Sequence, residues 1–341
     1  MRVFLLAFAF LSLPLSVFAD TAPAQYHLEH EFVLGGDGGW DDFAYDAAGQ
    51  RLFLSRATRV MVVDAVKGTL LAEIPDTAGV HEIALAQDLG KGFTSNGKED
   101  TVTVFDLKTL KPTAKIKVTG GNPDAIMYEP VTKRVFTFNG HGNNATVIDA
   151  VSGAVVATIP LAGKPEFAVA DGKGMVYVNI EDKSSLSTID ARKAVVVNTW
   201  SLAPCDSPSG LAMDVKNRRL FAGCDNKLMA VMDADTGKVV ATLPIGEGVD
   251  GTGFDPGTGL AFSSNGEGTL TVIHEDSPDK YSVLQDAATR KFARTMTLDP
   301  ASHRVYLVTA EVELTPDPQG GRPKRNVLPG TFKLLVMGPQ Q

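Results

Sequence analysis

The chain has 341 residues, of which 44% are hydrophobic, and a formal net charge of −8 at pH 7. The hydrophobic content is ordinary for a protein with a buried core, whereas the net negative charge argues against broad attraction to nucleic acid or anionic lipid. Length alone allows two domains, so the domain count must come from the pattern along the chain.

The first nineteen residues have the features of a secretory signal. A basic Met1-Arg2 start precedes an apolar segment at residues 3–11, and Ala19 is a small residue at the expected cleavage point. We therefore expect residues 1–19 to be a signal peptide and the mature protein to be periplasmic or secreted. The alternative is a membrane anchor, but the apolar run is short and is interrupted at Pro14. No later stretch is long and apolar enough to cross a membrane.

From residue 41 onward the chain repeats a unit of four short β-rich runs. The residues that precede the first run of each unit are separated by 40, 43, 42, 43, 41 and 44 positions, and they are Asp41, His81, Asp124, Glu166, Ser209, Asp250 and Arg294. Four strands in a period of this length are typical of propeller blades. The sequence therefore predicts an all-β fold in which residues 20–341 form a single seven-bladed β-propeller domain of four-stranded antiparallel blades.

The two ends of the repeat region complement each other. A strand-like segment at residues 26–34 stands before the first unit, and the last unit stops after residues 332–337, one strand short. We expect the N-terminal strand to complete the last blade, because this closes the ring and removes exposed strand edges.

The last unit also carries an insertion of about twenty residues, 311–331, with four prolines. This long loop is either a rim or lid loop or a poorly ordered insert. Its Arg322-Pro-Lys-Arg325 segment is a local basic patch, but we do not expect nucleic acid as the partner.

The pattern within the units resembles the YVTN-type repeat family of β-propellers. The resemblance is clearest in the second runs, Met-Val-Tyr-Val-Asn at residues 175–179 and Arg-Val-Phe-Thr-Phe-Asn at residues 134–139, and in third runs that end in Ile-Asp. It covers nearly the whole mature chain and implies the seven-bladed fold. Proteins of similar appearance include surface-layer proteins, a periplasmic DNA-binding propeller, propeller subunits of amine dehydrogenases and lactone-cleaving enzymes, so the resemblance does not select one activity.

The two cysteines both fall in the fifth unit. Cys205 precedes its first run and Cys224 ends its second run. Antiparallel neighbouring strands bring these two ends to the same rim, so in an exported protein we expect a disulfide. The alternative is a pair of small, buried, unpaired side chains.

In a propeller the inner strand of each blade starts on the same face on which the second strand ends. We therefore expect two rings at the mouth of the central channel. The inner ring contains the seven residues that mark the repeat. The outer ring follows the second runs and contains Arg56, Asn96, Asn139 with His141, Asn179 with Glu181, Asp225, Asn265 with Glu267, and Glu311.

These rings bring several carboxylates into one opening. Like charges at close range raise each other's pKa unless a cation offsets them, so the arrangement calls for a bound partner. We expect ligand contacts from Asp41, Asp124, Glu166, Asp250, Asn139, His141, Asn179, Glu181, Asn265 and Glu267. For the repeated asparagines the alternative is an internal brace, because Asn side chains at strand ends often bond to nearby backbone.

The first functional interpretation is a monomeric, exported propeller that binds a small molecule or a partner protein at the mouth and requires no cofactor. The alternative is a metal-assisted hydrolase or lyase of the lactonase sort. In that case Asp124, Glu166 and Asp250 hold a divalent cation, Ca²⁺ or Zn²⁺, while His81 acts as general base and Arg294 stabilises an oxyanion. The sequence contains no Gly-x-Ser-x-Gly, His-Glu-x-x-His, phosphate-loop or haem-attachment motif, so whether the protein is an enzyme stays open.

Overall fold

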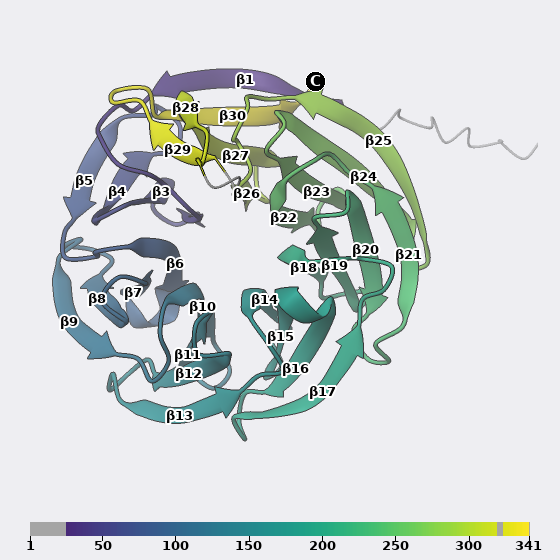
Figure 1. The fold of residues 1–341 in the computed structure, drawn as a ribbon, viewed down its shortest axis with the longest axis horizontal. Coiled ribbons are helices and arrows are strands. Elements are labelled where there is room, and N and C mark those ends of the chain that lie inside the picture. Colours follow the sequence, from purple (N-terminus) through teal and green to yellow (C-terminus); the bar gives the residue numbers. More distant parts are fainter. Residues whose placement is uncertain (1–24, 319–322, 341) are drawn as a thin grey trace, which may run out of the picture.

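The computed structural model describes residues 25–318 and 323–340 and confirms the seven-bladed β-propeller of four-stranded antiparallel blades (Figure 1). The blades surround a central channel, with the first strand of each blade innermost. The predicted signal peptide lies outside the described residues. Within these two ranges, no helix has the length and apolar character needed to cross a bilayer.

Six blades each consist of four consecutive strands, which follow one another from the channel outwards. The first three blades are β2 (Phe43–Asp46), β3 (Arg51–Arg56), β4 (Arg59–Asp64) and β5 (Leu70–Ile74); β6 (Val80–Ala86), β7 (Lys91–Asn96), β8 (Thr101–Asp106) and β9 (Pro112–Lys117); and β10 (Pro123–Glu129), β11 (Arg134–Asn139), β12 (Asn144–Asp149) and β13 (Val155–Pro160). The next three are β14 (Pro165–Ala170), β15 (Met175–Ile180), β16 (Ser185–Asp190) and β17 (Val195–Ser201); β18 (Pro208–Asp214), β19 (Arg219–Cys224), β20 (Leu228–Asp233) and β21 (Val239–Pro244); and β22 (Val249–Asp255), β23 (Leu260–Asn265), β24 (Thr269–Ser277) and β25 (Lys280–Ala288). Short 3₁₀ turns follow β6 and β15, at Gln87–Leu89 and Glu181–Lys183.

The seventh blade is completed by the N-terminal strand, as predicted. Its order is β26 (Met296–Asp299), β27 (Arg304–Thr309), β30 (Lys333–Pro339) and β1 (Tyr26–Val33), with β1 antiparallel to β30. Lys333 Nζ lies 2.9 Å from Glu31 Oε1 across this pair. Because the two chain ends share one blade, opening the ring requires breaking a strand pair.

The second and third strands of each blade are largely buried because neighbouring blades cover both of their faces. Phe53 of the first blade packs on Phe105 of the second with ring centroids 5.6 Å apart, and Phe221 stacks on Phe254 between the fifth and sixth blades at 5.1 Å. Fourth strands face solvent on the outer side, and β13 accordingly has exposed positions along most of its length. The core is therefore a set of apolar layers between blades.

Aspartates at the ends of the third strands cap the turns that follow, on the face opposite the mouth. Asp149 Oδ1, for example, accepts hydrogen bonds from the backbone N–H groups of Val151 at 3.1 Å and Ser152 at 2.7 Å. Such bonds are the usual reason for Asp at this position of a turn.

Irregular pairing at the start of the inner strands positions the mouth. In β6 the register with β7 shifts between Val80 and Ile83, and in β10 the register with β11 shifts between Pro123 and Ile126. The same irregularity occurs in β14, β18 and β22. A β-bulge of this kind re-aims side chains, so consecutive residues can face one opening instead of alternating.

The insertion at residues 311–331 contains a short hairpin of β28 (Val312–Thr315) and β29 (Lys324–Val327). The backbone N–H of Leu328 donates to Glu311 O at 2.9 Å, which closes the base of this hairpin. Val312 and Val327 line a hollow that also includes Asp41 and Arg294. The described part of the insertion therefore stands at the rim of the mouth, next to the seventh blade (Figure 1).

Candidate functional site

All seven residues that mark the repeat line one cavity of about 250 Å³ at the channel mouth. The complete lining is Asp41, Asp42, His81, Glu82, Asp124, Ala125, Lys164, Glu166, Phe167, Glu181, Ser209, Asp225, Val249, Asp250 and Arg294. These described residues include eight carboxyl groups but three basic groups. The cavity is thus strongly polar, and its carboxyl groups outnumber its basic groups.

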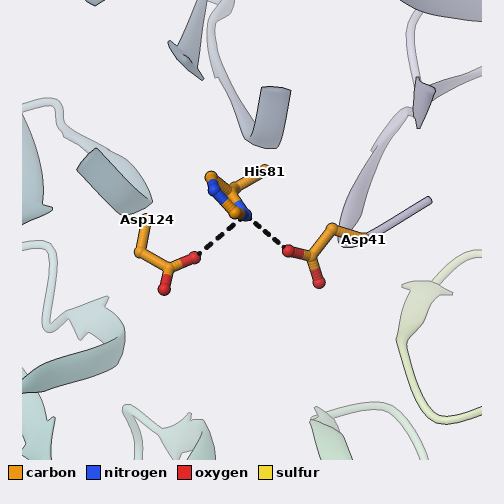
Figure 2. A group of neighbouring side chains, drawn as sticks. All are labelled: Asp41, His81 and Asp124. Atoms are coloured by element: carbon orange, nitrogen blue, oxygen red, sulfur yellow. Dashed lines mark hydrogen bonds and ion pairs between the residues drawn. The ribbon is translucent and has the colours of Figure 1, made fainter. Parts of the chain in front are cut away.

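His81 lies between two carboxylates of the neighbouring blades (Figure 2). Its Nδ1 is 2.7 Å from Asp41 Oδ2 and 3.3 Å from Asp124 Oδ1. Burial by itself lowers the pKa of His81, but the hydrogen bond with Asp41 and the charges of Asp124 and Asp41 outweigh it and raise this pKa to about 9. His81 is therefore an imidazolium at neutral pH. This differs from the expected general base, because a base must be unprotonated to accept a proton.

The expected metal set of Asp124, Glu166 and Asp250 is split by basic residues. Lys164 Nζ lies 2.6 Å from Glu166 Oε1 and also contacts Glu181, while Arg294 Nε lies 3.2 Å from Asp250 Oδ2. Glu166 and Asp250 therefore already have their own counter-charges. Lys164 stands two residues before the repeat-marking Glu166, so the spacing of the repeat does not reveal it.

A different group meets the geometric requirement for a metal ion. Among the described residues, Asp41, His81 and Asp124 each offer one ligand atom, and these atoms lie within 4.8 Å of one another. An ion at this point would have to displace the proton of His81, because only neutral imidazole binds metal.

Two further carboxyl groups, which the sequence pattern did not reveal, line the same cavity. Asp42 and Glu82 directly follow repeat-marking residues, and the simple strand alternation would turn them away. Glu82 Oε2 accepts a hydrogen bond of 2.7 Å from the backbone N–H of Ile126. Asp42 is 8% exposed, and its Oδ1 has no hydrogen-bond partner among the described residues. For Glu82 the cause is the bulge in β6, which cannot be read from hydrophobic alternation.

Burial and neighbouring negative charges raise the pKa values of several of these carboxyl groups. Burial raises the pKa of Glu82 to about 8, and burial together with the charge of Asp124 raises the pKa of Glu166 to about 8 despite Lys164. Burial raises the pKa of Asp250 to about 6 against the opposing charge of Arg294. Burial and the charge of Glu82 raise the pKa of Asp42 well above its usual range. The mouth therefore holds protons near neutral pH that a cation could replace.

The asparagines of the outer ring do not face the cavity, in contrast to the expected ligand contacts. Asn139, Asn179 and Asn265 are fully buried. Asn139 Nδ2 donates to Asn144 Oδ1 at 2.7 Å and Thr146 Oγ1 at 2.9 Å. Asn265 makes the equivalent bonds to Thr269 and Thr271, and Asn179 bonds to the backbone of the next inner strand. These side chains brace strand ends, because a buried amide needs internal partners.

The remaining outer-ring residues are distributed around the rim. Glu181 lines the cavity, where it contacts Lys164. Exposed His141 borders a separate groove beside His81, and exposed Glu267 borders another hollow next to Arg294. These two residues therefore lie at the periphery of the mouth.

A second hollow of about 240 Å³, with apolar side chains on part of its wall, adjoins the mouth and shares Asp41 and Arg294 with it. Phe292 forms part of its wall with a backbone φ of +65°, a left-handed conformation. For a bulky residue this conformation costs roughly 1–2 kcal/mol. Phe292 is held there by a 2.8 Å hydrogen bond from its N–H to Gly266 O.

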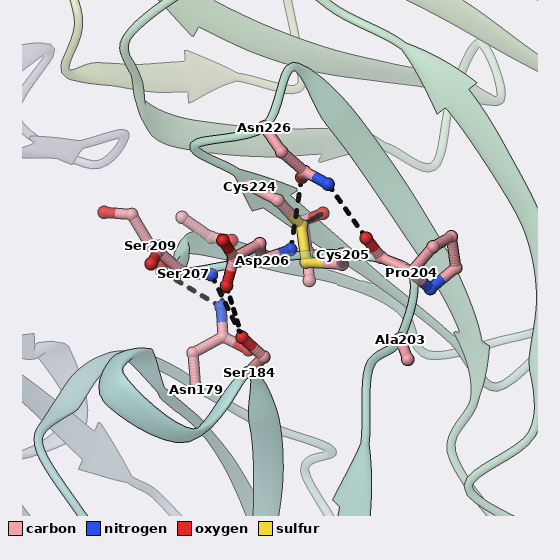
Figure 3. Close-up of a disulfide and its surroundings, with 12 residues drawn as sticks. Asn179, Ser184, Ala203, Pro204, Cys205, Asp206, Ser207, Ser209, Cys224 and Asn226 are labelled. Atoms are coloured by element: carbon pink, nitrogen blue, oxygen red, sulfur yellow. Dashed lines mark hydrogen bonds between the residues drawn. A yellow bond between two sulfur atoms is a disulfide. The ribbon is translucent and has the colours of Figure 1, made fainter.

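The disulfide between Cys205 and Cys224 is present, as predicted (Figure 3). It ties the loop before β18 to the end of β19, with the two Cα atoms 5.6 Å apart. Asn226 reinforces the same loop, because its Nδ2 donates to Pro204 O at 2.8 Å and its Oδ1 accepts from Asp206 N at 3.1 Å. The disulfide lies beside the inner strand that carries Ser209 and so fixes one side of the mouth.

Comparison with known proteins supports the fold. No family model and no curated protein matches the chain. The solved structure of U3-55K is 9% identical, with 91% of this chain and 98% of that chain covered and a TM-score of 0.73. The crystal structure of RRP9 WD40 repeats is 10% identical, with 93% and 99% covered and a TM-score of 0.74. The chain therefore shares the seven-bladed propeller fold with these proteins, while membership of the YVTN-type repeat family stays a prediction.

Proposed function

We propose that this protein is an exported propeller that binds a small, positively charged ligand at the mouth of its central channel. The observation that carries the proposal is the excess of carboxyl groups over basic groups in a cavity of about 250 Å³. This volume suits a small molecule or ion rather than a protein domain. The signal-like N-terminus and the disulfide support a periplasmic or secreted location.

The raised pKa values make the affinity of the mouth for a cation depend on pH. Glu82, with a pKa of about 8, holds a proton in the free protein at pH 7, and the pKa of Glu166 is raised to about 8 although Lys164 lies beside it. A bound cation favours the ionised carboxylates and lowers both pKa values, so binding releases protons. The affinity for a cation should consequently rise between pH 6 and pH 8.

Isothermal titration calorimetry with ethylenediamine, Ca²⁺ and Zn²⁺, at pH 6 and pH 8, tests this proposal. We expect at least one cation to bind more tightly at pH 8, with a buffer-dependent enthalpy that reports proton release. Asp124→Asn combined with Glu166→Gln should weaken that binding at least tenfold without lowering the melting temperature. Asp235→Asn with Asp279→Asn is the matched control, since it removes the same number of carboxyl groups from two residues that are 60% and 72% exposed. Failure of every cation to bind at pH 8 would refute the proposal.

The second candidate function is metal-assisted hydrolysis or lyase chemistry, now centred on Asp41, His81 and Asp124 rather than on the expected set. The three residues would hold the ion, and the ion would supply Lewis-acid chemistry. Glu82 lines the same cavity, and a bound ion would lower its pKa and release its proton, so Glu82 replaces His81 as the candidate base. Stoichiometric zinc or calcium in the purified mature protein, with chelator-sensitive turnover of a lactone panel, would favour this alternative. Metal-free protein without turnover favours the binding function.

A further inference from the structure

The acidic cavity and the second hollow, whose wall is partly apolar, form one composite surface. Both are lined by Asp41 and Arg294, which come from adjacent blades; Thr295 Oγ1, next to Arg294, donates to Asp41 O at 3.2 Å. Beyond these two residues the hollow is lined by the apolar side chains of Trp40, Phe292, Val312 and Val327, together with Gly39, Thr295 and Arg325. A ligand that spans the boundary would place a polar part in the cavity and an apolar part in the hollow.

Arg294 offers donors at this boundary. Its Nε lies 3.2 Å from Asp250 Oδ2, but its two terminal nitrogens make no hydrogen bond or ion pair with any other described residue. The side chain is 38% exposed and borders both hollows. Two parallel N–H groups of a guanidinium are the usual partner of a carboxylate. A ligand that is only cationic would leave these donors unused and would be repelled by their charge.

The carboxylates opposite offer acceptors. Asp41 uses Oδ2 and Asp124 uses Oδ1 toward His81, while within the described ranges neither Asp41 Oδ1 nor Asp124 Oδ2 accepts a hydrogen bond. Both side chains are partly exposed to the cavity. An ammonium group, with three donors, suits two such oxygens. A ligand that is only anionic would meet the excess of carboxylates without compensation.

The hollow suits a large apolar group. Trp40 is backed by Phe332 at a ring-centroid distance of 5.7 Å, and the guanidinium carbon of Arg325 lies 5.4 Å from the centre of the Phe292 ring. Each aromatic wall thus packs against a neighbouring side chain. The left-handed backbone of Phe292 is a strained conformation of the kind that concentrates at binding sites.

We infer that the ligand is a free amino acid with a large apolar side chain. Its ammonium group binds Asp41 and Asp124, its carboxylate binds Arg294, and its side chain lies between Trp40 and Phe292. This inference rests on the proposed function, which supplies the cationic group, and adds the carboxylate and the apolar part.

Calorimetry at pH 8 with four probes separates the three parts of the ligand. L-phenylalanine carries all of them, phenethylamine lacks the carboxylate, 3-phenylpropanoate lacks the ammonium group and glycine lacks the side chain. We expect L-phenylalanine to bind at least tenfold more tightly than each of the others. Binding of phenethylamine as tight as that of L-phenylalanine overturns the inference but leaves the proposed function intact. If L-phenylalanine, phenethylamine and the inorganic cations all fail to bind, the proposed function itself is overturned.

Three variants at two positions assign the contacts. Arg294→Gln should abolish the preference for L-phenylalanine over phenethylamine, and Arg294→Lys, which keeps the charge beside Asp250, should reduce it. Trp40→Ala should abolish the preference for L-phenylalanine over glycine. Arg290→Gln is the matched control for charge, because Arg290 pairs with Glu31 at 3.0 Å outside both hollows. An unchanged preference in a folded Arg294→Lys protein and a folded Arg294→Gln protein contradicts the carboxylate contact.

Discussion

His81→Gln tests the charge state of the mouth. The pKa of His81 is raised from 6.5 to about 9, because the hydrogen bond with Asp41 and the charges of Asp124 and Asp41 outweigh the effect of burial. A pKa that is higher in the folded than in the unfolded protein stabilises the fold fully below pH 6.5, and this contribution is lost as the pH rises through 9. The shift corresponds to roughly 2 to 3 kcal/mol, allowing for an imidazole that is 29% exposed.

The measurement is the free energy of unfolding in urea at constant ionic strength, from pH 5.5 to pH 9.5. We expect the deficit of His81→Gln relative to the wild type to be largest near pH 6 and to shrink by roughly 2 to 3 kcal/mol toward pH 9.5. His141→Gln, which removes an exposed imidazole from the same rim, should follow the wild type at every pH. Glutamine can also lower the stability by a constant amount through poorer packing. Only the change of the deficit with pH therefore reports the charge of His81.

An NMR titration of the imidazole resonances provides an independent check. The chain has six histidines, and the resonance that disappears in His81→Gln identifies the one at the mouth. We expect its midpoint near pH 9. A midpoint at or below 6.5, or a stability deficit that stays constant with pH, would refute the argument that the two carboxylates hold His81 as a cation.

Three further predictions concern the scaffold around the mouth. Replacing Cys205 and Cys224 by serine should lower the unfolding free energy by about 3 kcal/mol, the loop-closure value for a separation of 19 residues, as measured in urea; an equal midpoint for the two proteins would contradict this. Asn139→Ala should cost about 1–3 kcal/mol of stability, because it leaves buried partners unsatisfied, and should leave calorimetric affinities unchanged. A loss of affinity without a loss of stability would restore Asn139 as a ligand contact. Phe292→Gly should be more stable than Phe292→Ala by about 1 kcal/mol in thermal unfolding, since both lose the ring but only glycine adopts positive φ without strain, while L-phenylalanine binding weakens in both. Unchanged binding in both variants would show that the ring only packs.

The asparagines and the acidic residues illustrate where sequence reasoning reached its limit. Asn139 and Asp124 both recur at fixed phases of the repeat, yet one braces a strand end and the other faces the cavity. The sequence places both residues at the same rim. The position of a residue within the repeat determines its level along the propeller axis and its distance from that axis. The direction of each side chain depends on the bulge and on the hydroxyl groups that surround it, as Thr137 and Thr146 surround Asn139.

Repetition alone determined the number of blades, the closure by the N-terminal strand and the set of seven residues around one opening. In a closed ring of equal units, residues at equivalent positions of the repeat must lie at the same level along the propeller axis. The tertiary structure alone decided the chemistry of that opening. It placed His81 between carboxylates of two other blades, turned Glu82 inward and gave Glu166 and Asp250 separate counter-charges. Protonation and ion pairing depend on distances of a few ångströms between residues some forty positions apart, and no repeat period specifies such distances.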